Sequence, residues 1–167
     1  GSVAGAVNSS GATVSSAIKV LGLDANVSTL SSFFIMSFPE NSPMMGQTKI
    51  FSDCAVVVAP TAEQLAEIAI HSAHNASRFL PQKKEGNTPR IALLSFSTHG
   101  SSKAQEATTV RNALEIISKR TDNGILDQGF LYDGELQLDA AIMPHVAKSK
   151  APESVLKGDA NVLIFPN

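Results

Sequence analysis

The chain has 167 residues, of which 43% are hydrophobic, and a formal net charge of -2. This length and content suffice for one globular domain with a sizeable core, and the scattered Lys and Arg residues offer no basic face for a nucleic acid. No apolar run approaches the roughly 20 residues that span a bilayer. We therefore expect residues 1–167 to form one soluble domain that binds neither nucleic acid nor membrane.

The first part of the chain predicts a short helix followed by two strands. Apolar residues recur at helical spacing over residues 14–21, and Gly22 follows where a C-terminal cap would lie. Apolar, β-branched and aromatic runs then predict strands over residues 29–38 and 48–58, separated by a loop with prolines and a glycine. Apolar segments alternate with helical segments, which is typical of an α/β domain.

A longer helix is predicted over residues 62–79, because Thr61 and Gln64 have the spacing of a capping box. Its expected buried stripe contains Leu65, Ile68, Ala69, Ser72, Ala73 and Ala76. A short buried strand is predicted over residues 90–96 and a second long helix over about residues 103–120.

The last third predicts a strand over residues 129–136, a short helical piece broken by Pro144, and a final strand over residues 161–166. A strand as apolar as the final one normally lies inside a parallel sheet and is followed by a covering helix. We therefore expect a mostly parallel sheet in a chain that is one domain of a longer polypeptide.

The loop "STHGSS", which follows the strand at residues 90–96, allows three interpretations. Ser97 and His99 have the side chains of a hydrolase nucleophile and base, but at this spacing they tend not to point at one another. A loop between a strand and a helix N-terminus also suits an anion, although it lacks the phosphate-binding lysine pattern and the three-glycine pattern. A plain turn is the third interpretation.

Histidine and cysteine give two further candidates. His71 and His74 lie three residues apart on a predicted helix, a spacing that metal ligands use, yet they lie opposite the apolar stripe, where a polar residue is simply solvated. Cys54, within an apolar run, is interpreted as a packed thiol and not a reactive one. A lone cysteine agrees with a reducing, cytoplasmic location.

Charged residues near the end of the chain are open to two readings each. Asp133, Glu135 and Asp139 could assist proton transfer or bind an ammonium group, and capping would equally explain two of these acids. Lys148 and Lys150 could hold a phosphate or form a solvated edge. The residues alone support an α/β domain with one candidate anion-binding loop.

Several motifs, in this order, give the chain a resemblance to a known family. They are "PTAEQLAEIAI", "IALLSFSTHGSSK", "DGELQLDAAI", "VAKSKAP" and "ANVLIFP", with "GAVNSS" and "SSFFIMSFP" before them. Together they resemble the core of the phosphate acetyltransferases, a family that includes the phosphate butyryltransferases. The resemblance covers essentially the whole chain.

The resemblance implies a three-layer α/β/α domain with a mostly parallel sheet, similar to isocitrate and isopropylmalate dehydrogenases. It implies reversible acetyl transfer between coenzyme A and inorganic phosphate, which yields acetyl phosphate. Coenzyme A or acetyl-CoA would be a substrate, with no permanently bound cofactor and no metal. The family members pair as homodimers, so a homodimer is expected here.

The chain also departs from the family pattern at several positions, and these departures bear on its expected activity. Ser15 stands where the family has an arginine that holds substrate phosphate, and a serine cannot make the same forked, charged contact. His99 and Glu153 stand where lysine and glycine are common. The family's N-terminal part and a later N-D-L-S-R-G segment are not matched. We therefore assign no catalytic residue and expect the chain alone to be inactive.

Ten residues can be mapped onto the family's cleft as substrate-binding candidates: Asn8, Ser9, Ser10, Ser97, Thr98, Gly100, Ser101, Lys148, Ser149 and Lys150. Two hypotheses follow. The chain is the central domain of a working phosphate acetyltransferase, or it is a non-catalytic fragment or paralogue that acts as a coenzyme A-binding or dimerisation module.

Overall fold

The computed structural model describes residues 3–25, 27–42, 44, 46–54, 56–80, 88–122 and 129–166. Contacts divide the chain into two compact units, Gly1–Leu30 and Ser31–Asn167, and each is described by itself. Among the described residues, none of the helices combines the length and the hydropathy of a membrane-spanning segment.

The described residues of the first unit include the helix α1 (Ser10–Leu21), as the spacing predicted. Ser9 caps its N-terminus, since its hydroxyl accepts the amide of Ala12 at 3.3 Å. Gly22 follows its last turn with φ of 73°, a backbone conformation that glycine adopts without strain. None of its residues is buried, and Leu21 is 78% exposed. Within the described residues of the first unit, α1 therefore buries none of its side chains.

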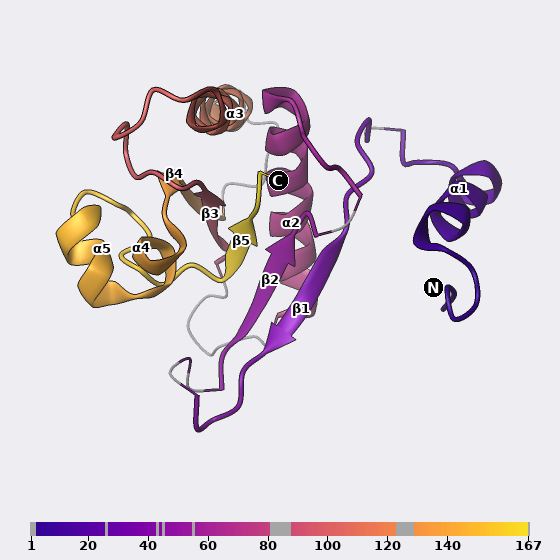
Figure 1. Cartoon of the computed structure of the whole chain (residues 1–167), viewed down its shortest axis with the longest axis horizontal. Helices are drawn as coiled ribbons and strands as arrows, with labels where there is room; N and C mark the ends of the chain where they lie inside the picture. The colour runs from indigo at the N-terminus through magenta and orange to yellow at the C-terminus, as the bar shows by residue number, and fades with distance from the viewer. Residues whose placement is uncertain are drawn as a thin grey trace. The chain divides into compact units, whose positions relative to one another are not determined.

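The second unit is built on a five-stranded sheet with the order β1-β2-β5-β3-β4. The strands are β1 (Phe33–Ser37), β2 (Thr48–Ser52), β3 (Arg90–Leu94), β4 (Leu131–Leu136) and β5 (Val162–Ile164). The edge strand β1 pairs with β2 in antiparallel fashion, and the other pairings are parallel. The prediction of a mostly parallel sheet is confirmed, with β5 inside it (Figure 1).

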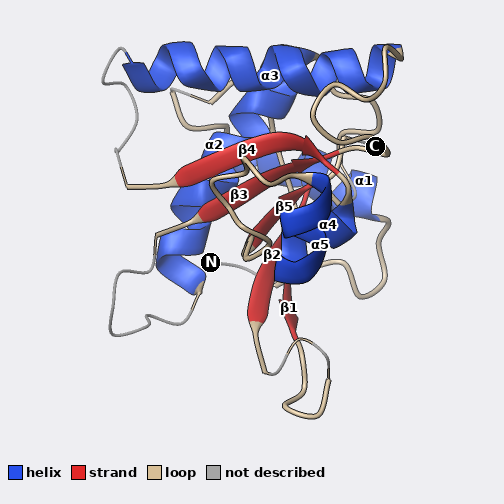
Figure 2. Ribbon diagram, turned by 90° about the vertical axis from the view of Figure 1, so that its left-hand side faces the viewer, coloured by secondary structure: helices blue, strands red, loops and turns tan. Residues whose placement is uncertain are grey.

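Helices lie on both faces of this sheet. Four follow or separate its strands: α2 (Ala62–Phe79), α3 (Gln105–Asp122), α4 (Leu138–Ile142) and α5 (Pro144–Lys150). Figure 2 shows α2 behind the sheet and α4 and α5 in front of it. One core lies between the sheet and the pair α2 and α3, and a second, smaller core lies under α4 and α5. The predicted three-layer α/β/α architecture is therefore confirmed.

The start of α2 shows how a local sequence signal sets an element. Thr61 and Gln64 form the predicted capping box, in which each side chain accepts the backbone amide of the other residue, at 3.3 and 3.0 Å. All six residues of the predicted stripe are buried. A local contact thus sets where the helix begins, and its buried stripe contributes to the larger core.

The second predicted strand is shorter than its apolar run, since β2 ends at Ser52 and not near residue 58. The reason is Asp53, whose carboxylate accepts the amide of Val57 at 2.6 Å and the amide of Ser32 at 3.1 Å. These side-chain contacts replace the strand ladder with a turn. Cys54 therefore lies after the strand and not within it.

Pro144 breaks the helical piece after β4 as predicted. It is the first residue of α5, where a missing amide is tolerated, and α4 ends at Ile142. Because β2, β5, β3 and β4 run parallel, their carboxyl ends meet at one edge of the sheet. We call this the C-terminal edge, and ligand sites of open α/β sheets lie at such an edge.

Candidate functional site

The loop after β3 forms a tight turn at the C-terminal edge. The amide of Ser101 donates to the carbonyl of Thr98 at 3.2 Å, and the hydroxyl of Ser101 accepts the amide of Thr98 at 3.1 Å. His99 and Gly100 have φ of 45° and 79°. Glycine takes this conformation without strain, and histidine is among the residues that take it more often than most.

Backbone contacts lay this loop along the end of β4. The amide of His99 donates to the carbonyl of Glu135 at 3.0 Å, and the hydroxyl of Thr98 accepts the amide of Gln137, also at 3.0 Å. The amides of Thr98, His99 and Ser101 are thus used within the protein. This supports the interpretation of the loop as a turn more than as a cradle of free amides.

Beneath the loop lies a buried polar cluster. Ser97 is 5% exposed and Glu135 is 0% exposed. The Ser97 hydroxyl donates to Oε1 of Glu135, and Arg111 Nη1 donates to Oε2 of the same carboxylate at 2.5 Å. Sequence reasoning missed Arg111, because its partner lies 24 residues further along the chain and no periodicity connects them. A buried carboxylate is tolerated when it is paired and hydrogen-bonded in this way.

Ser97 and His99 do not form a nucleophile and base pair. His99 Nε2 lies 3.3 Å from Oδ1 of Asp133, on β4, and Ser97 is bonded to Glu135. Oδ1 of Asp133 also accepts the amide of Gly134 at 2.8 Å. Within the part of the chain that the structure describes, Oδ2 of Asp133 is buried without a hydrogen-bond partner. The hydrolase interpretation is therefore not supported.

The end of α5 lies beside the loop, and Gln137 joins the two. Lys150 Nζ donates to Gln137 Oε1 at 3.1 Å and pairs with Asp139 Oδ2 at 2.7 Å. The hydrogen bond from Lys150 lowers the pKa of the Asp139 carboxyl. Lys148 and Ser149 are exposed on the same last turn. Gln137 was missed in the sequence because its contact with Thr98 spans 39 residues.

The candidates Asn8, Ser9 and Ser10 lie in the first unit. Ser9 is the cap of α1 and Ser10 is its first residue, and both are exposed. Asn8 lines a hollow of about 500 Å³ along α1, together with Ala4, Ala12, Thr13, Ser16, Ala17, Val20 and Leu21. Ser15 is exposed on the same helix. The role of Asn8, Ser9 and Ser10 in substrate binding stays a prediction.

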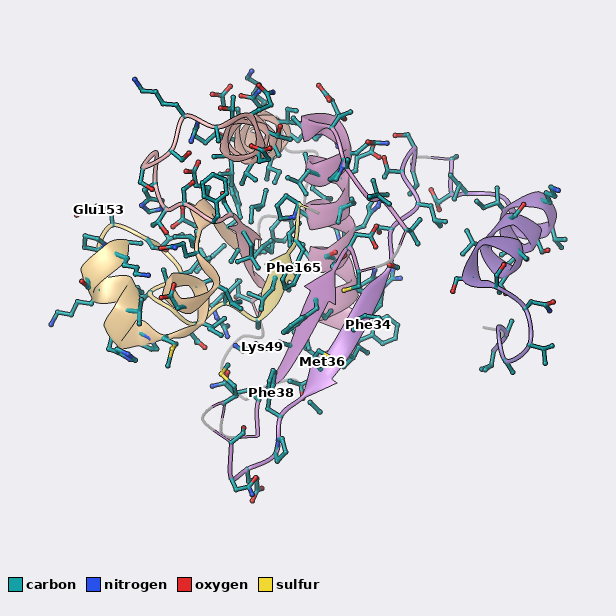
Figure 3. The ribbon with its side chains drawn as sticks, viewed as in Figure 1. Phe34, Met36, Phe38, Lys49, Glu153 and Phe165 are labelled. Carbon is teal, nitrogen blue, oxygen red and sulfur yellow. The ribbon has the colours of Figure 1, made fainter. Side chains whose placement is uncertain are left out.

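A partly apolar hollow of about 390 Å³ adjoins the loop. It is lined by Leu94, Ser95, Phe96, Glu106, Leu138, Phe165 and Pro166. Figure 3 shows Phe165 at the end of β5, and its ring packs against that of Phe51 with centroids 5.5 Å apart. An apolar hollow with polar groups at its side is typical of small-molecule sites. The edge thus combines a hollow, a hydroxyl-rich loop and the cationic end of α5.

The remaining candidates have structural surroundings. His71 and His74 are half-buried on α2, and the His74 ring lies edge-on to Phe130 at 6.1 Å. Across the described ranges, no group of three or more His, Cys, Asp or Glu side chains could hold a metal ion. The Cys54 thiol donates to the carbonyl of Phe51 at 2.9 Å, and burial raises its pKa. A raised pKa disfavours the reactive thiolate, which agrees with a packed cysteine.

Comparison with known proteins identifies the family. Residues 1–167 match the family model described as "Phosphate acetyl/butaryl transferase". The chain belongs to this family. It is 41% identical over 170 residues to a phosphate acetyltransferase of Treponema pallidum and 41% identical over 167 residues to one of Bacillus subtilis.

Solved structures agree with the sequence comparison. A phosphotransacetylase from Streptococcus pyogenes matches 98% of this chain with a TM-score of 0.81 and 39% identity. The EutD phosphotransacetylase from Staphylococcus aureus matches 93% of it with a TM-score of 0.78 and 37% identity. The chain spans about half the length of these relatives: 47% and 46% of the two phosphate acetyltransferases, and 45% and 43% of the two structures.

Proposed function

We propose that this chain is part of a phosphate acetyltransferase, which transfers an acetyl group reversibly between coenzyme A and inorganic phosphate. The observation that carries the proposal is the match of the entire chain to the family, at about 40% identity to proteins named phosphate acetyltransferase. We propose that the full-length protein completes the cleft, of which the C-terminal edge forms one wall.

Acetyl transfer requires particular chemical groups around the substrates in this cleft. The thiol sulfur of coenzyme A attacks the carbonyl carbon of acetyl phosphate, so that a C–S bond forms and the C–O bond to phosphate breaks. The thiol proton passes to a base, and phosphate leaves with the electron pair. Charge develops on the carbonyl oxygen and on the phosphate, and both need donors or cations near them. We assign neither the base nor any other catalytic residue to this chain.

We propose that the substrate-binding residues of the second unit lie at the C-terminal edge. Thr98, Gly100 and Ser101 present one face of the loop, and Lys148 and Ser149 present the end of α5. Lys150 would contribute to a phosphate site only by exchanging Asp139 for the ligand, since the two are paired at 2.7 Å. Because Ser97 is bonded to Glu135 beneath the loop, its contribution would be indirect.

For the first unit we propose Asn8, Ser9 and Ser10 as substrate-binding residues, and we also propose that residues 1–167 are one domain of the full-length protein. Their support is the resemblance of "GAVNSS" to the family and the exposure of these side chains. Coenzyme A, phosphate and acetyl phosphate are proposed as substrates. We propose that the protein has no permanently bound cofactor and no metal, and that it binds neither nucleic acid nor membrane. We also propose that it is cytoplasmic.

We also propose a homodimer, supported by the edge strand β1. Phe34, Ile35 and Met36 are 55%, 48% and 40% exposed, and the strand carries no charged residue. Figure 3 shows Phe34 and Met36 on this strand and Phe38 directly after it. Edge strands that remain in water usually carry charges or proline, whereas this one is suited to pairing with a second copy.

Sedimentation equilibrium tests the homodimer. Ile35→Lys is expected to convert a dimer to a monomer, because a lysine on an edge strand opposes pairing. Val58→Lys is the matched control, since Val58 is 84% exposed outside the strand. A wild-type protein that sediments as a monomer would reject the proposal.

The enzyme proposal is tested by the formation of acetyl-CoA from coenzyme A and acetyl phosphate. We expect turnover by the full-length protein and none by the 167-residue chain, because the chain spans about half of its relatives. Absence of turnover in the full-length protein would reject the proposal.

A second candidate function is a coenzyme A-binding or dimerisation module without catalysis. Ser15 favours it, because the family commonly has an arginine there for substrate phosphate. Calorimetry with acetyl-CoA separates the two: binding by the full-length protein without turnover would support the module.

A further inference from the structure

Glu135 is a fully buried carboxylate to which the proposed transfer gives no role. It lies near the end of β4, is 0% exposed, and is bonded through separate oxygens to the Ser97 hydroxyl and to Arg111. Its own backbone carbonyl accepts the amide of His99 at 3.0 Å. One residue of β4 therefore contacts the loop after β3 at two of its positions.

Arg111 links Glu135 to the other end of that loop. Its Nη1 donates to the carbonyl of Ser102 at 3.1 Å as well as to Glu135, and its Nη2 donates to the Thr108 hydroxyl at 2.9 Å. The guanidinium thus joins the beginning of α3, the end of the loop and the buried carboxylate. Arginine suits this task because its donors lie in one rigid plane.

The loop between these contacts holds the residues proposed to meet substrate. Ser97 fixes its start through Glu135, and Ser102 fixes its end through Arg111. Thr98, Gly100 and Ser101 lie between them. A change in the Arg111–Glu135 pair would therefore displace the residues proposed to bind substrate without removing any of them.

We propose that Arg111 and Glu135 are positioning residues, which set the shape of the 97–102 loop for the binding of coenzyme A or phosphate. The inference rests on the proposed function for the identity of the ligand, and on the described contacts for the positioning. An apolar pair of similar volume would often stabilise a protein as well as a buried ion pair does. The directional bonds of this pair are what an apolar pair would not reproduce.

The test separates positioning from stability by means of three variants of the full-length protein. Arg111→Met leaves the Glu135 carboxylate buried without its countercharge, so thermal stability is expected to fall strongly. Arg111→Met combined with Glu135→Gln removes that charge, and stability is expected to return towards the wild-type value. The carbonyl of Ser102 still lacks its arginine donor in the double variant.

Lys49→Met is the matched control. Lys49, labelled in Figure 3, is a cation on β2 that is 2% exposed and so more deeply buried than Arg111. Its ammonium donates to the carbonyl of Ala160. In the sheet, β5 and β3 separate β2 from β4. This variant is expected to lose stability without any change in the loop.

Two readouts are expected to move in the double variant although stability has returned. The KM for coenzyme A is expected to rise by about tenfold with a smaller change in kcat, the pattern for a loss of binding that the ground state and the transition state share. Hydrogen exchange at the amides of His99 and Ser101 is expected to quicken by about tenfold or more in the protein without ligand, while exchange in β5 stays slow.

The KM and the hydrogen exchange of these variants decide whether the pair positions the loop. Wild-type KM and wild-type exchange in the stable double variant would overturn the inference, as would an equal rise of KM in Lys49→Met. If the wild-type protein forms no acetyl-CoA, the proposed function fails, and the exchange measurement alone decides whether the pair positions the loop.

Discussion

The C-terminal edge of the sheet carries two ion pairs of the same chemical kind in different surroundings. In the Arg111–Glu135 pair, the side chain of Glu135 is 0% exposed and that of Arg111 is 34% exposed. In the Lys150–Asp139 pair, the side chain of Lys150 is 40% exposed and that of Asp139 is 44% exposed. Both pairs lie next to the loop, one through Ser97 and the other through Gln137.

Burial gives these pairs different consequences. A carboxylate without access to water depends on its partners, so Glu135 and the groups bonded to it must move together. Water competes for an exposed pair, and Lys150 can leave Asp139 at little cost. The buried pair therefore suits the positioning of a loop, and the exposed pair suits exchange with an incoming anion.

The largest expected effect comes from breaking the buried pair alone. Arg111→Met is expected to lower the free energy of unfolding by about 3 kcal/mol, near the lower end for buried pairs because water reaches the arginine. Urea denaturation measures the change. Arg78→Met, at an exposed position on α2, is the control. A loss for Arg111→Met no larger than that of this control would remove the distinction between the two pairs.

The packing beside Glu135 gives a second way to test the buried region. A Cβ added at Gly134 would lie 2.7 Å from the carbonyl oxygen of Leu93, which is backbone in the core of the sheet. Gly134→Ala is therefore expected to cost about 1–3 kcal/mol in the free energy of unfolding. At Gly129 a Cβ would meet nothing within 4 Å, so Gly129→Ala is the matched control. Equal stability of the two variants would show that this region is not tightly packed.

The exposed pair should show a smaller effect on stability. Lys150→Met is expected to change the free energy of unfolding by less than about 1 kcal/mol, the range for exposed pairs. The same denaturation experiment checks this value. A loss equal to that of Arg111→Met would mean that exposure does not separate the two pairs.

The smallest effect concerns pH. The Lys150 hydrogen bond lowers the pKa of Asp139 in the folded protein, so the carboxylate adds stability that is fully present above its unfolded pKa of about 3.9. This contribution is lost as the pH falls through the lower, folded pKa. The stability difference between the wild-type protein and Asp139→Asn should therefore be below about 1 kcal/mol at neutral pH and vanish in acid. A difference that grows in acid would contradict this sign.

Much of the fold follows from local sequence, as α2 illustrates. Thr61 and Gln64 are three residues apart, so the sequence itself contains the contact that starts the helix. The end of β2 shows the opposite case. Asp53 stops the strand partly through Ser32, which lies 21 residues earlier, and the apolar run after Asp53 gave no sign of this contact.

In the candidate site, too, features that depend on neighbouring residues were predicted and contacts between distant residues were not. The loop after β3 was predicted, because a strand, a small polar loop and a helix follow one another directly. Arg111 and Gln137 were not, because their contacts with Glu135 and Thr98 join residues 24 and 39 positions apart. Ser97 was predicted to meet substrate, and its buried bond to Glu135 could not be read from its neighbours in the sequence.

Hydrogen exchange of the full-length protein with and without acetyl-CoA tests most directly whether the C-terminal edge is the ligand site. The opposite edge provides an internal comparison, since a hollow of about 410 Å³ there is lined by His74, Ser77, Arg78, Thr88, Pro89, Gly129 and Phe130. We predict that acetyl-CoA slows exchange in residues 95–104 and 137–150 and leaves residues 74–80 unchanged. Slower exchange at residues 74–80 with none at the loop would contradict the assignment of the site.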